Sequence, residues 1–212
     1  MATARAAAGN REGTTAMAHR NLPARLRLFA SVLATICISS LAAGGASAAT
    51  NPCEPEILRA ADRYGVPAGI LYAVGLTETG KKGSLQPNAL NIEGKAVFPR
   101  SRDEALATFE NARREGKTLI DLGCMQINQH YHGNHFRSVE DMLDPHQNVD
   151  YAARFLAALH ARHMTWSMAV ARYHAGPHND PAQKVYVCRV IANMVATGFG
   201  KWTPNASTFC NQ

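Results

Sequence analysis

The sequence of 212 residues predicts a mainly α protein of the α+β class, with one small β-hairpin. Three observations support this fold class. Apolar residues recur at helical spacing in six segments. Proline stands just inside several segment starts and glycine just after several ends, which is the usual asymmetry of helix termini. One stretch, residues 89–99, has the turn chemistry of a hairpin instead.

Residues 1–48 have the pattern of an export signal. Three arginines precede the apolar stretch 28–41, and a run of small residues ends at Ala48. A membrane anchor is the competing interpretation, but the apolar stretch is shorter than the roughly 20 residues that a spanning helix needs. Met17 is an alternative start of the chain. We therefore expect a cleaved signal peptide and an exported protein of the periplasm or cell envelope, without stable membrane insertion.

The basic character of the whole chain comes largely from that segment. It holds five of the 22 Lys and Arg residues and one of the 16 Asp and Glu residues, so the remainder has 17 cations against 15 anions, a net charge of +2. Arg113, Arg114 and Lys117 form a small cluster that is interpreted as a solvated helix face. No nucleic-acid partner is expected.

The remaining residues are predicted to form one domain, 49–199, and a tail. Apolar side chains recur on one face of residues 54–64 and of residues 67–79, where proline opens the helix. Glu93–Gly94 stands at the centre of the predicted hairpin 89–99.

Four more helices follow the hairpin. Ser101 and Glu104 form a capping box for a helix over residues 102–114. The other three are predicted to begin with residues 145, 166 and 180 and to reach at least residues 159, 174 and 195. The tail, 200–212, is expected to be irregular and to lie on the surface.

Four cysteines follow the signal segment: Cys53, Cys124, Cys188 and Cys210. An even number in an exported chain indicates disulfides. Three pairings are possible, and the sequence does not choose among them. A bridge between Cys188 and Cys210 is the local expectation, because it would fix the tail to the last helix. No cysteine spacing resembles a metal site.

Glu78 is the candidate general acid. It shares the apolar face of the helix 67–79 with Ile70, Leu71 and Val74. Burial of a carboxyl without a cationic partner raises its pKa, so that it can donate a proton near neutral pH. The alternative is a Glu at a helix end that turns into water past Gly80.

Two later segments have compositions suited to lining a cleft. Residues 123–128 mix a glycine with apolar side chains and with Gln126 and Asn128, whose amides suit hydrogen bonding to sugars. The alternative is a buried turn that these amides only cap. Tyr173 stands just before a helix end, where its hydroxyl is expected to hydrogen bond the Glu78 carboxyl. Its alternative is a core tyrosine.

In this order, the three pieces resemble the soluble lytic transglycosylase family, whose domain is similar to goose-type lysozyme. That family shows Glu-Ser, then Gly-Leu-Met-Gln-Ile, then Ala-Tyr-Asn-Ala-Gly. This chain has Glu78-Thr79, Gly123-Cys124-Met125-Gln126-Ile127-Asn128 and Ala171-Arg172-Tyr173-His174-Ala175-Gly176-Pro177. The resemblance spans about residues 53–195 and implies a lysozyme-like helical domain.

The resemblance also implies an activity. The expected reaction is cleavage of the β-1,4 bond between N-acetylmuramic acid (MurNAc) and N-acetylglucosamine (GlcNAc) in peptidoglycan, with formation of 1,6-anhydro-MurNAc. Glu78 would act first as acid and then as base toward the C6 hydroxyl of the substrate. No cofactor and no metal are implied. The implied substrate-binding residues are Thr79, Met125, Gln126, Asn128, Tyr173 and His174.

Three positions depart from the family pattern. Thr79 replaces Ser and keeps the hydroxyl, and Cys124 replaces Leu with a small apolar side chain. His174 replaces Asn, and an imidazole reproduces the hydrogen bonds of an amide only in one tautomer and carries charge when protonated. The expected consequence at His174 is a changed substrate preference or pH response.

The 44 residues between Glu78 and Gly123 exceed the spacing in compact family members. This part contains Leu90, Asn91 and Gly94, and later Asp121, in a pattern that looks like the branch found with conjugation, type IV secretion or pilus systems. The resemblance therefore implies components of such a machine as partners, and local opening of the wall as the task.

Three rival functions remain open at this stage. A hydrolytic muramidase would use water in place of the C6 hydroxyl, with Asp121 as a candidate second carboxylate or, equally, a turn former. A non-catalytic wall-binding assembly protein would keep the fold alone. A metalloprotein is suggested only by His130, His132 and His135, which are interpreted as part of a loop.

Overall fold

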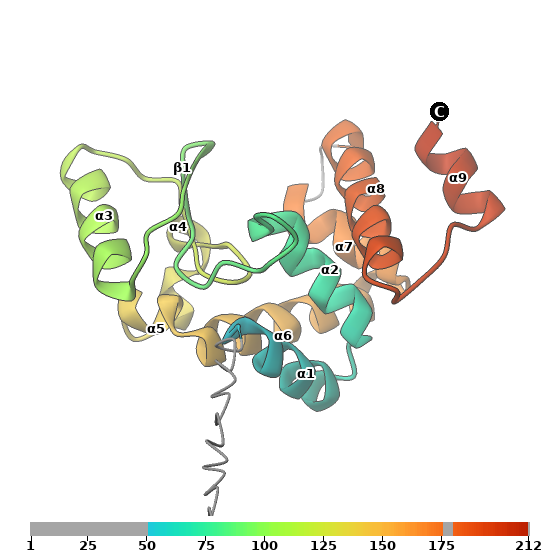
Figure 1. The fold of residues 1–212 in the computed structure, drawn as a ribbon, viewed down its shortest axis with the longest axis horizontal. Coiled ribbons are helices and arrows are strands. Elements are labelled where there is room, and N and C mark those ends of the chain that lie inside the picture. The colour runs from blue at the N-terminus through green and yellow to red at the C-terminus, as the bar shows by residue number, and fades with distance from the viewer. Residues whose placement is uncertain (1–50, 176–179, 212) are drawn as a thin grey trace, which may run out of the picture. The chain divides into compact units, whose positions relative to one another are not determined.

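A computed structural model describes residues 51–175 and 180–211, all of which belong to one compact unit (Figure 1). The predicted signal peptide, 1–48, lies outside the described residues, as do Gly176 and Pro177 of the third motif. Within the described ranges, no helix combines the length and apolar character that crossing a bilayer requires.

All six predicted helices are present, and the mainly α fold class is confirmed. Their bounds agree with the sequence patterns to within a few residues. They are α1 (Cys53–Tyr64), α2 (Ala68–Thr79), α3 (Arg102–Arg114), α6 (Pro145–His163), α7 (Trp166–Ala175) and α8 (Asp180–Ala196).

The helix termini follow the expected chemistry. The Ser101 side chain accepts a hydrogen bond from Glu104 N at 3.1 Å, and the Glu104 carboxylate accepts one from Arg100 N at 2.9 Å. The capping box therefore reaches one residue further back than its usual form. At the start of α6, Asp144 accepts a hydrogen bond from Gln147 N at 3.0 Å, ahead of a first-turn proline.

Four short helical segments were not predicted. The loop interpretation of the histidine segment is wrong, because α4 (Gln129–His132) and a 3-10 turn (Gly133–His135) occupy it, before α5 (Val139–Leu143). The prediction of an irregular tail is also wrong, because most of the tail forms the helix α9 (Pro204–Asn211). Thr203 caps α9 by accepting a hydrogen bond from Ala206 N at 3.1 Å, so a polar cap starts a helix that has no buried residue.

The predicted hairpin is confirmed as part of a larger antiparallel sheet. β1 (Leu90–Ile92) and β2 (Lys95–Val97) are joined by Glu93 and Gly94, both at positive φ, as a two-residue hairpin turn requires. The sheet continues with β3 (Ile120–Leu122) and β4 (Ile127–Asn128) in the order β2-β1-β3-β4. The sheet thus ends at the segment that carries the second motif.

The helices that position the three motifs pack against one another. α1 packs on α6, α2 packs on α8, and α7 packs on both α6 and α8, as Figure 1 also shows for α1 with α6 and α2 with α8. Large apolar side chains from these helices and from the sheet fill the shared core, among them Leu71, Leu122, Met125 and Leu156. The end of α2 is therefore brought next to the second and third motifs.

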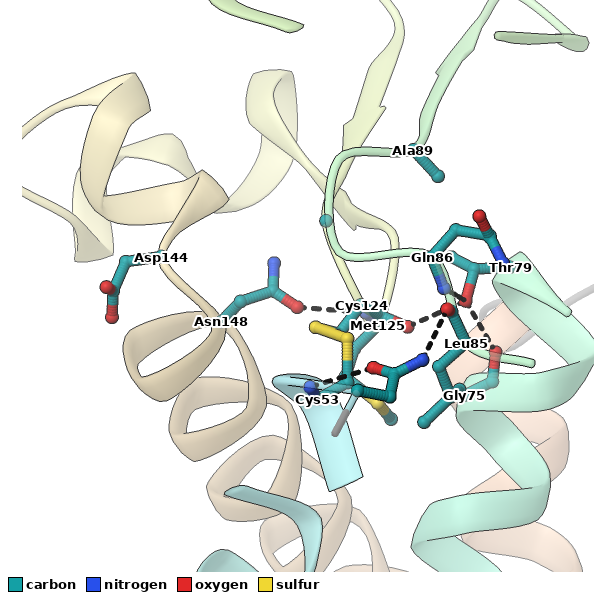
Figure 2. Close-up of a disulfide and its surroundings, with 12 residues drawn as sticks. Cys53, Gly75, Thr79, Leu85, Gln86, Ala89, Cys124, Met125, Asp144 and Asn148 are labelled. Carbon is teal, nitrogen blue, oxygen red and sulfur yellow. Dashed lines mark hydrogen bonds between the residues drawn. A yellow bond between two sulfur atoms is a disulfide. The ribbon is translucent and has the colours of Figure 1, made fainter. Parts of the chain in front are cut away.

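Two disulfides join distant parts of this unit. Cys53 is bonded to Cys124, and Cys188 is bonded to Cys210. The second pairing confirms the local expectation for the tail. The first links the start of α1 to the second motif, and Figure 2 shows it surrounded by Thr79, Met125 and Asn148.

Candidate active site

Glu78 lies near the C-terminal end of α2, the helix that packs against α8. Its side chain is 15% exposed, so the carboxyl is mostly buried and does not turn into water past Gly80. The Tyr186 hydroxyl donates a hydrogen bond of 2.7 Å to Glu78 Oε1. One carboxyl oxygen is therefore held by the protein, as a residue of fixed orientation in an active site requires.

Tyr186 is a site residue that the sequence analysis missed. It is 3% exposed. Burial, with the negative charge of Glu78 and the hydrogen bond to it, raises the pKa of Tyr186 well above its ordinary value. The hydroxyl therefore keeps its proton at every pH relevant to the protein and remains a donor to Glu78.

Val185 is 53% exposed, whereas α8 buries Tyr186, Val187 and Val190. These three stand at spacings i, i+1 and i+4, which also form a helical face. That spacing is the signal that could have identified Tyr186.

Tyr173 does not make the hydrogen bond expected of it. Its hydroxyl donates to the backbone oxygen of Met125 at 2.9 Å, while Tyr186 occupies the position on Glu78. Burial and the nearby Glu78 charge raise the pKa of Tyr173 well above its ordinary value. Tyr173 therefore ties α7 to the second motif, close enough to Glu78 to sense its charge.

The second motif is held from behind by Asn148, a fully buried residue of α6 that the sequence analysis missed. Asn148 Oδ1 accepts from Met125 N at 2.9 Å, and its Nδ2 donates to Leu122 O and Met142 O, both at 2.8 Å. Gly123 has φ +78°, and a Cβ there would lie 2.7 Å from Asn148 Nδ2. Glycine is thus required for this loop to close on Asn148.

Met125 and Thr79 support the site from its buried side. Met125 is fully buried, so its side chain packs in the core and does not present a surface to a sugar ring. Thr79 is 2% exposed, and its hydroxyl lies 3.0 Å from Gly75 O and 3.2 Å from Cys124 O (Figure 2). The same hydroxyl accepts from Gln86 N at 3.3 Å.

Gln126 and Asn128 are half-buried and stabilise the turn that carries them. Gln126 Nε2 donates to Ala89 O at 3.0 Å and to Gly123 O at 3.1 Å. Asn128 caps α4 through its Oδ1 and donates from Nδ2 to Asp121 Oδ1 at 2.6 Å. These contacts agree with the turn-capping interpretation, and direct binding of substrate by either amide stays a prediction.

Asp121 brings a second carboxyl near Glu78. Burial raises its pKa, the hydrogen bond from Asn128 opposes that rise, and the negative charge of Glu78 adds to it. The charge of His174 acts on Asp121 in the opposite direction. The pKa of Asp121 is therefore set mainly by its burial and by Asn128, with smaller effects from the charges of Glu78 and His174.

His174 faces the exposed side of the site. Its side chain is 44% exposed, and its Nδ1 lies 3.7 Å from Glu78 Oε1. Its ring stacks on Tyr186, with centroids 4.2 Å apart and planes at 2°. Both rings line a cavity of about 320 Å³, together with Pro181, Ala182, Val185 and Arg189.

Two further features lie apart from these contacts. Nδ1 of His132 forms a hydrogen bond of 2.8 Å with the Tyr151 hydroxyl, and burial lowers the pKa of His132.

In the described part of the chain, no group of three or more His, Cys, Asp or Glu residues is arranged to hold a metal. A cavity of about 790 Å³ between α7, α8 and α9 includes none of Glu78, His174 or Tyr186 in its lining.

The arrangement is suited to acid–base chemistry on a substrate that approaches from the His174 side. A mostly buried carboxyl is oriented by a phenol that stays protonated, and an imidazole stands at the rim. A carboxylic acid so placed donates a proton to a leaving oxygen and then accepts one in return.

Comparison with known families agrees with this geometry. A family model described as the transglycosylase SLT domain matches residues 56–188, which is more than half of the chain. The matched range contains Glu78, the loop 123–128, Tyr173 and Tyr186. No curated protein and no solved structure gives a significant match.

Proposed function

Because the chain belongs to the transglycosylase SLT domain family, which comprises lytic transglycosylases acting on peptidoglycan, we propose a specific reaction for its site. Glu78 cleaves the β-1,4 bond between MurNAc and GlcNAc, and the MurNAc product ends in a 1,6-anhydro ring. The observation that carries this proposal is the mostly buried Glu78 carboxyl held through Oε1 by Tyr186.

In the first step, protonated Glu78 gives its proton to the glycosidic oxygen. The bond from that oxygen to C1 of MurNAc breaks, and positive charge develops on the sugar ring. Glu78 becomes a carboxylate at the same time. The hydrogen bond from Tyr186 stabilises the negative charge as it forms on Oε1.

In the second step, the Glu78 carboxylate takes the proton from the C6 hydroxyl of the same MurNAc. O6 bonds to C1 and closes the anhydro ring, and Glu78 ends protonated, as it began. No water is consumed. Because the nucleophile belongs to the substrate, proximity replaces the second carboxylate that hydrolytic glycosidases use.

Hydrolysis is the second candidate, because Asp121 is a partly buried carboxyl whose pKa responds to the charge of Glu78. A hydrolase would use Asp121 to position or activate a water that attacks C1. Product mass separates the two reactions: anhydro-muropeptides are one water lighter than hydrolysis products. We expect purified sacculi to yield the lighter products with the protein and with its Asp121→Asn variant, and mainly hydrated products would favour the muramidase.

Among the binding residues, Gln126 and His174 are proposed to contact substrate most directly. His174 is at the exposed rim, and Gln126 is half-buried in the loop beside it. Thr79, Met125, Asn128 and Tyr173 are proposed to act indirectly, by holding the walls in place. The contacts given above support an indirect role for the last four, since each is engaged with other parts of the protein. Gln126 is also engaged through Nε2, so its contact with substrate rests on the family resemblance.

We also propose that the protein is exported and opens the wall locally for an envelope-spanning conjugation, secretion or pilus machine. The export pattern of residues 1–48 and the resemblance of the 79–122 segment support this role. Fractionation of the native host should find the processed protein in the periplasm. Deletion of its gene should lower transfer or secretion efficiency, and restoration by the wild-type gene but not by Glu78→Gln would tie the effect to cleavage.

A further inference from the structure

The histidine at position 174 changes the electrostatics around Glu78. Nδ1 of His174 lies 3.7 Å from Glu78 Oε1, the oxygen that also accepts the Tyr186 hydrogen bond at 2.7 Å. This separation exceeds a normal hydrogen bond but is short for two opposite charges. A protonated imidazole at this place therefore attracts the ionised form of Glu78.

The His174 ring is held in this position by a buried platform. It stacks on Tyr186 with centroids 4.2 Å apart and an angle of 2° between the planes. Tyr186 is 3% exposed and is itself fixed by its hydrogen bond to Glu78. The His174 side chain is 44% exposed, so its ring exchanges protons with solvent while keeping its distance from Glu78.

We propose that His174 is a positioning residue that acts as a pH-dependent counterion of Glu78. The protonated imidazole pairs with the Glu78 carboxylate and holds it ionised, and loss of the imidazole proton ends this pairing. The inference rests on the proposed function of Glu78 as the acid. Its consequence is a restraint on wall cleavage under mildly acidic conditions.

The direction of the expected change in rate follows from the proton that cleavage needs. Glu78 must be protonated to begin the reaction, whereas the ion pair keeps the proton on His174. Replacing His174 with an uncharged residue therefore increases the fraction of Glu78 that is protonated. The increase is greatest around pH 6, where an imidazole ordinarily titrates, and disappears at alkaline pH, where His174 is neutral.

The other groups around His174 do not account for such a dependence equally well. Tyr173 and Tyr186 stay protonated, because burial raises the pKa of each well above its ordinary value. Arg189 lines the same cavity and keeps a constant charge. Among the described residues, Asp121 is the rival, since burial raises its pKa and the charges of Glu78 and His174 act on it.

The kinetic test compares the wild type with His174→Asn, which restores the family residue, and His174→Phe, which keeps a ring to stack on Tyr186. The rate of muropeptide release from sacculi is measured from pH 4 to pH 9. Because His174 is also proposed to contact substrate, each rate is divided by the rate of the same protein at pH 8. On this scale both variants should exceed the wild type severalfold near pH 6, with their alkaline limb at higher pH. Superimposed scaled profiles, or scaled rates below the wild type near pH 6, would overturn the proposal.

The Asp121→Asn background removes the rival. If His174→Asn shifts the alkaline limb equally in that background, Asp121 is not the titrating group. If the shift disappears there, the pH response belongs to Asp121 and the proposal fails. Equal thermal unfolding midpoints confirm that the variants are folded.

A second measurement does not depend on cleavage. The ring-proton resonance of His174, identified by its loss in His174→Asn, is followed by NMR through a pH titration. Its midpoint should lie at lower pH in Glu78→Gln than in the wild type, because the carboxylate that stabilises the imidazolium is gone. An unchanged midpoint would contradict the pairing of His174 with Glu78. A shifted midpoint in a protein that cleaves no peptidoglycan would contradict only the proposed function.

Discussion

Glu78 depends on one strong neutral donor. The Tyr186 hydroxyl reaches its Oε1 across 108 positions of sequence and stays protonated because it is buried. In the proposed reaction, this hydrogen bond contributes most when Glu78 has given up its proton, since a hydrogen bond to a charged acceptor is stronger than one to a neutral acceptor. We therefore propose that Tyr186 acts through Glu78.

Tyr186→Phe removes this donor and keeps the ring that supports His174. We expect the rate of muropeptide release to fall by about tenfold or more, since a hydrogen bond to a charged group contributes roughly 1.5–3 kcal/mol. Tyr173→Phe is the control, because that hydroxyl bonds the Met125 backbone and not Glu78. Full activity in Tyr186→Phe, or an equal loss in Tyr173→Phe, would contradict the assignment.

Thr79 gives a test of the buried side of the site. Thr79→Val leaves Cys124 O and Gln86 N without their buried partner, and we expect the free energy of unfolding to fall by about 1–3 kcal/mol. Thr79→Ser keeps the hydroxyl and should be nearly neutral. Denaturant titration measures both, and a Val variant as stable as the Ser variant would show that the hydroxyl is not structural.

The sequence predicted a mostly buried carboxyl at Glu78 because the signal was local: an acidic residue on the apolar stripe of its own helix. Tyr186 and Asn148 were missed because their roles exist only once distant segments meet. Asn148 accepts a hydrogen bond from Met125 N, 23 positions away. It lies on the apolar face of its own helix, four residues before Ala152, but that pattern does not reveal its partner. Partners of this kind follow from the packing of helices, which the pattern of a single segment does not contain.

Among the elements of secondary structure, the long helices could be predicted from their own sequence and the short strands could not. The six helices of ten or more residues repeat their apolar faces often enough to be identified. β3 and β4, with three and two residues, are too short for alternation to be visible. They form because β1 offers an edge for pairing, which places the 123–128 loop beside the end of α2.

The contact between α1 and α6 makes a prediction about pH. Asp150 of α6 accepts from Tyr64 at 2.7 Å and from Arg59 and Arg63 at 3.2 Å. Burial alone would raise the pKa of Asp150, but these hydrogen bonds and charges outweigh it and lower that pKa. The carboxylate therefore stabilises the fold above its ordinary pKa of 3.8, and this stabilisation is lost as the pH falls through the lower folded value.

We expect Asp150→Asn to lower the free energy of unfolding by about 1–3 kcal/mol at pH 7. The difference from the wild type should shrink as the pH falls below 3.8. Asp62→Asn, on the exposed side of α1, is the control and should change little. Chemical denaturation at pH 7 and at pH 3 measures both, and a constant difference at the two pH values would refute the role of the Asp150 charge.

In the molecule as a whole, the two disulfides stabilise different parts of the chain. Cys53–Cys124 spans 71 positions and joins two fully buried cysteines next to the active site. Cys188–Cys210 spans 22 positions and holds α9, which has no buried residue. The first bridge constrains the unfolded chain more and also anchors the 123–128 loop to the start of α1.

Loop-closure entropy gives about 4 kcal/mol for the Cys53–Cys124 bridge and about 3 kcal/mol for the Cys188–Cys210 bridge. We expect Cys53→Ser with Cys124→Ser to lose more stability and also activity. Cys188→Ser with Cys210→Ser should lose less stability and keep the rate of cleavage. Thermal unfolding and muropeptide release measure the two effects, and loss of activity only in the second pair would reverse the assignment.

The most direct test of the account compares the wild type with Glu78→Gln on purified sacculi. The substitution keeps the size of the side chain and an acceptor for Tyr186, but removes the proton that starts the reaction. We predict that the folded variant releases no muropeptides above background while the wild type releases anhydro products. Release by Glu78→Gln at a rate close to the wild type would show that another group cleaves the wall.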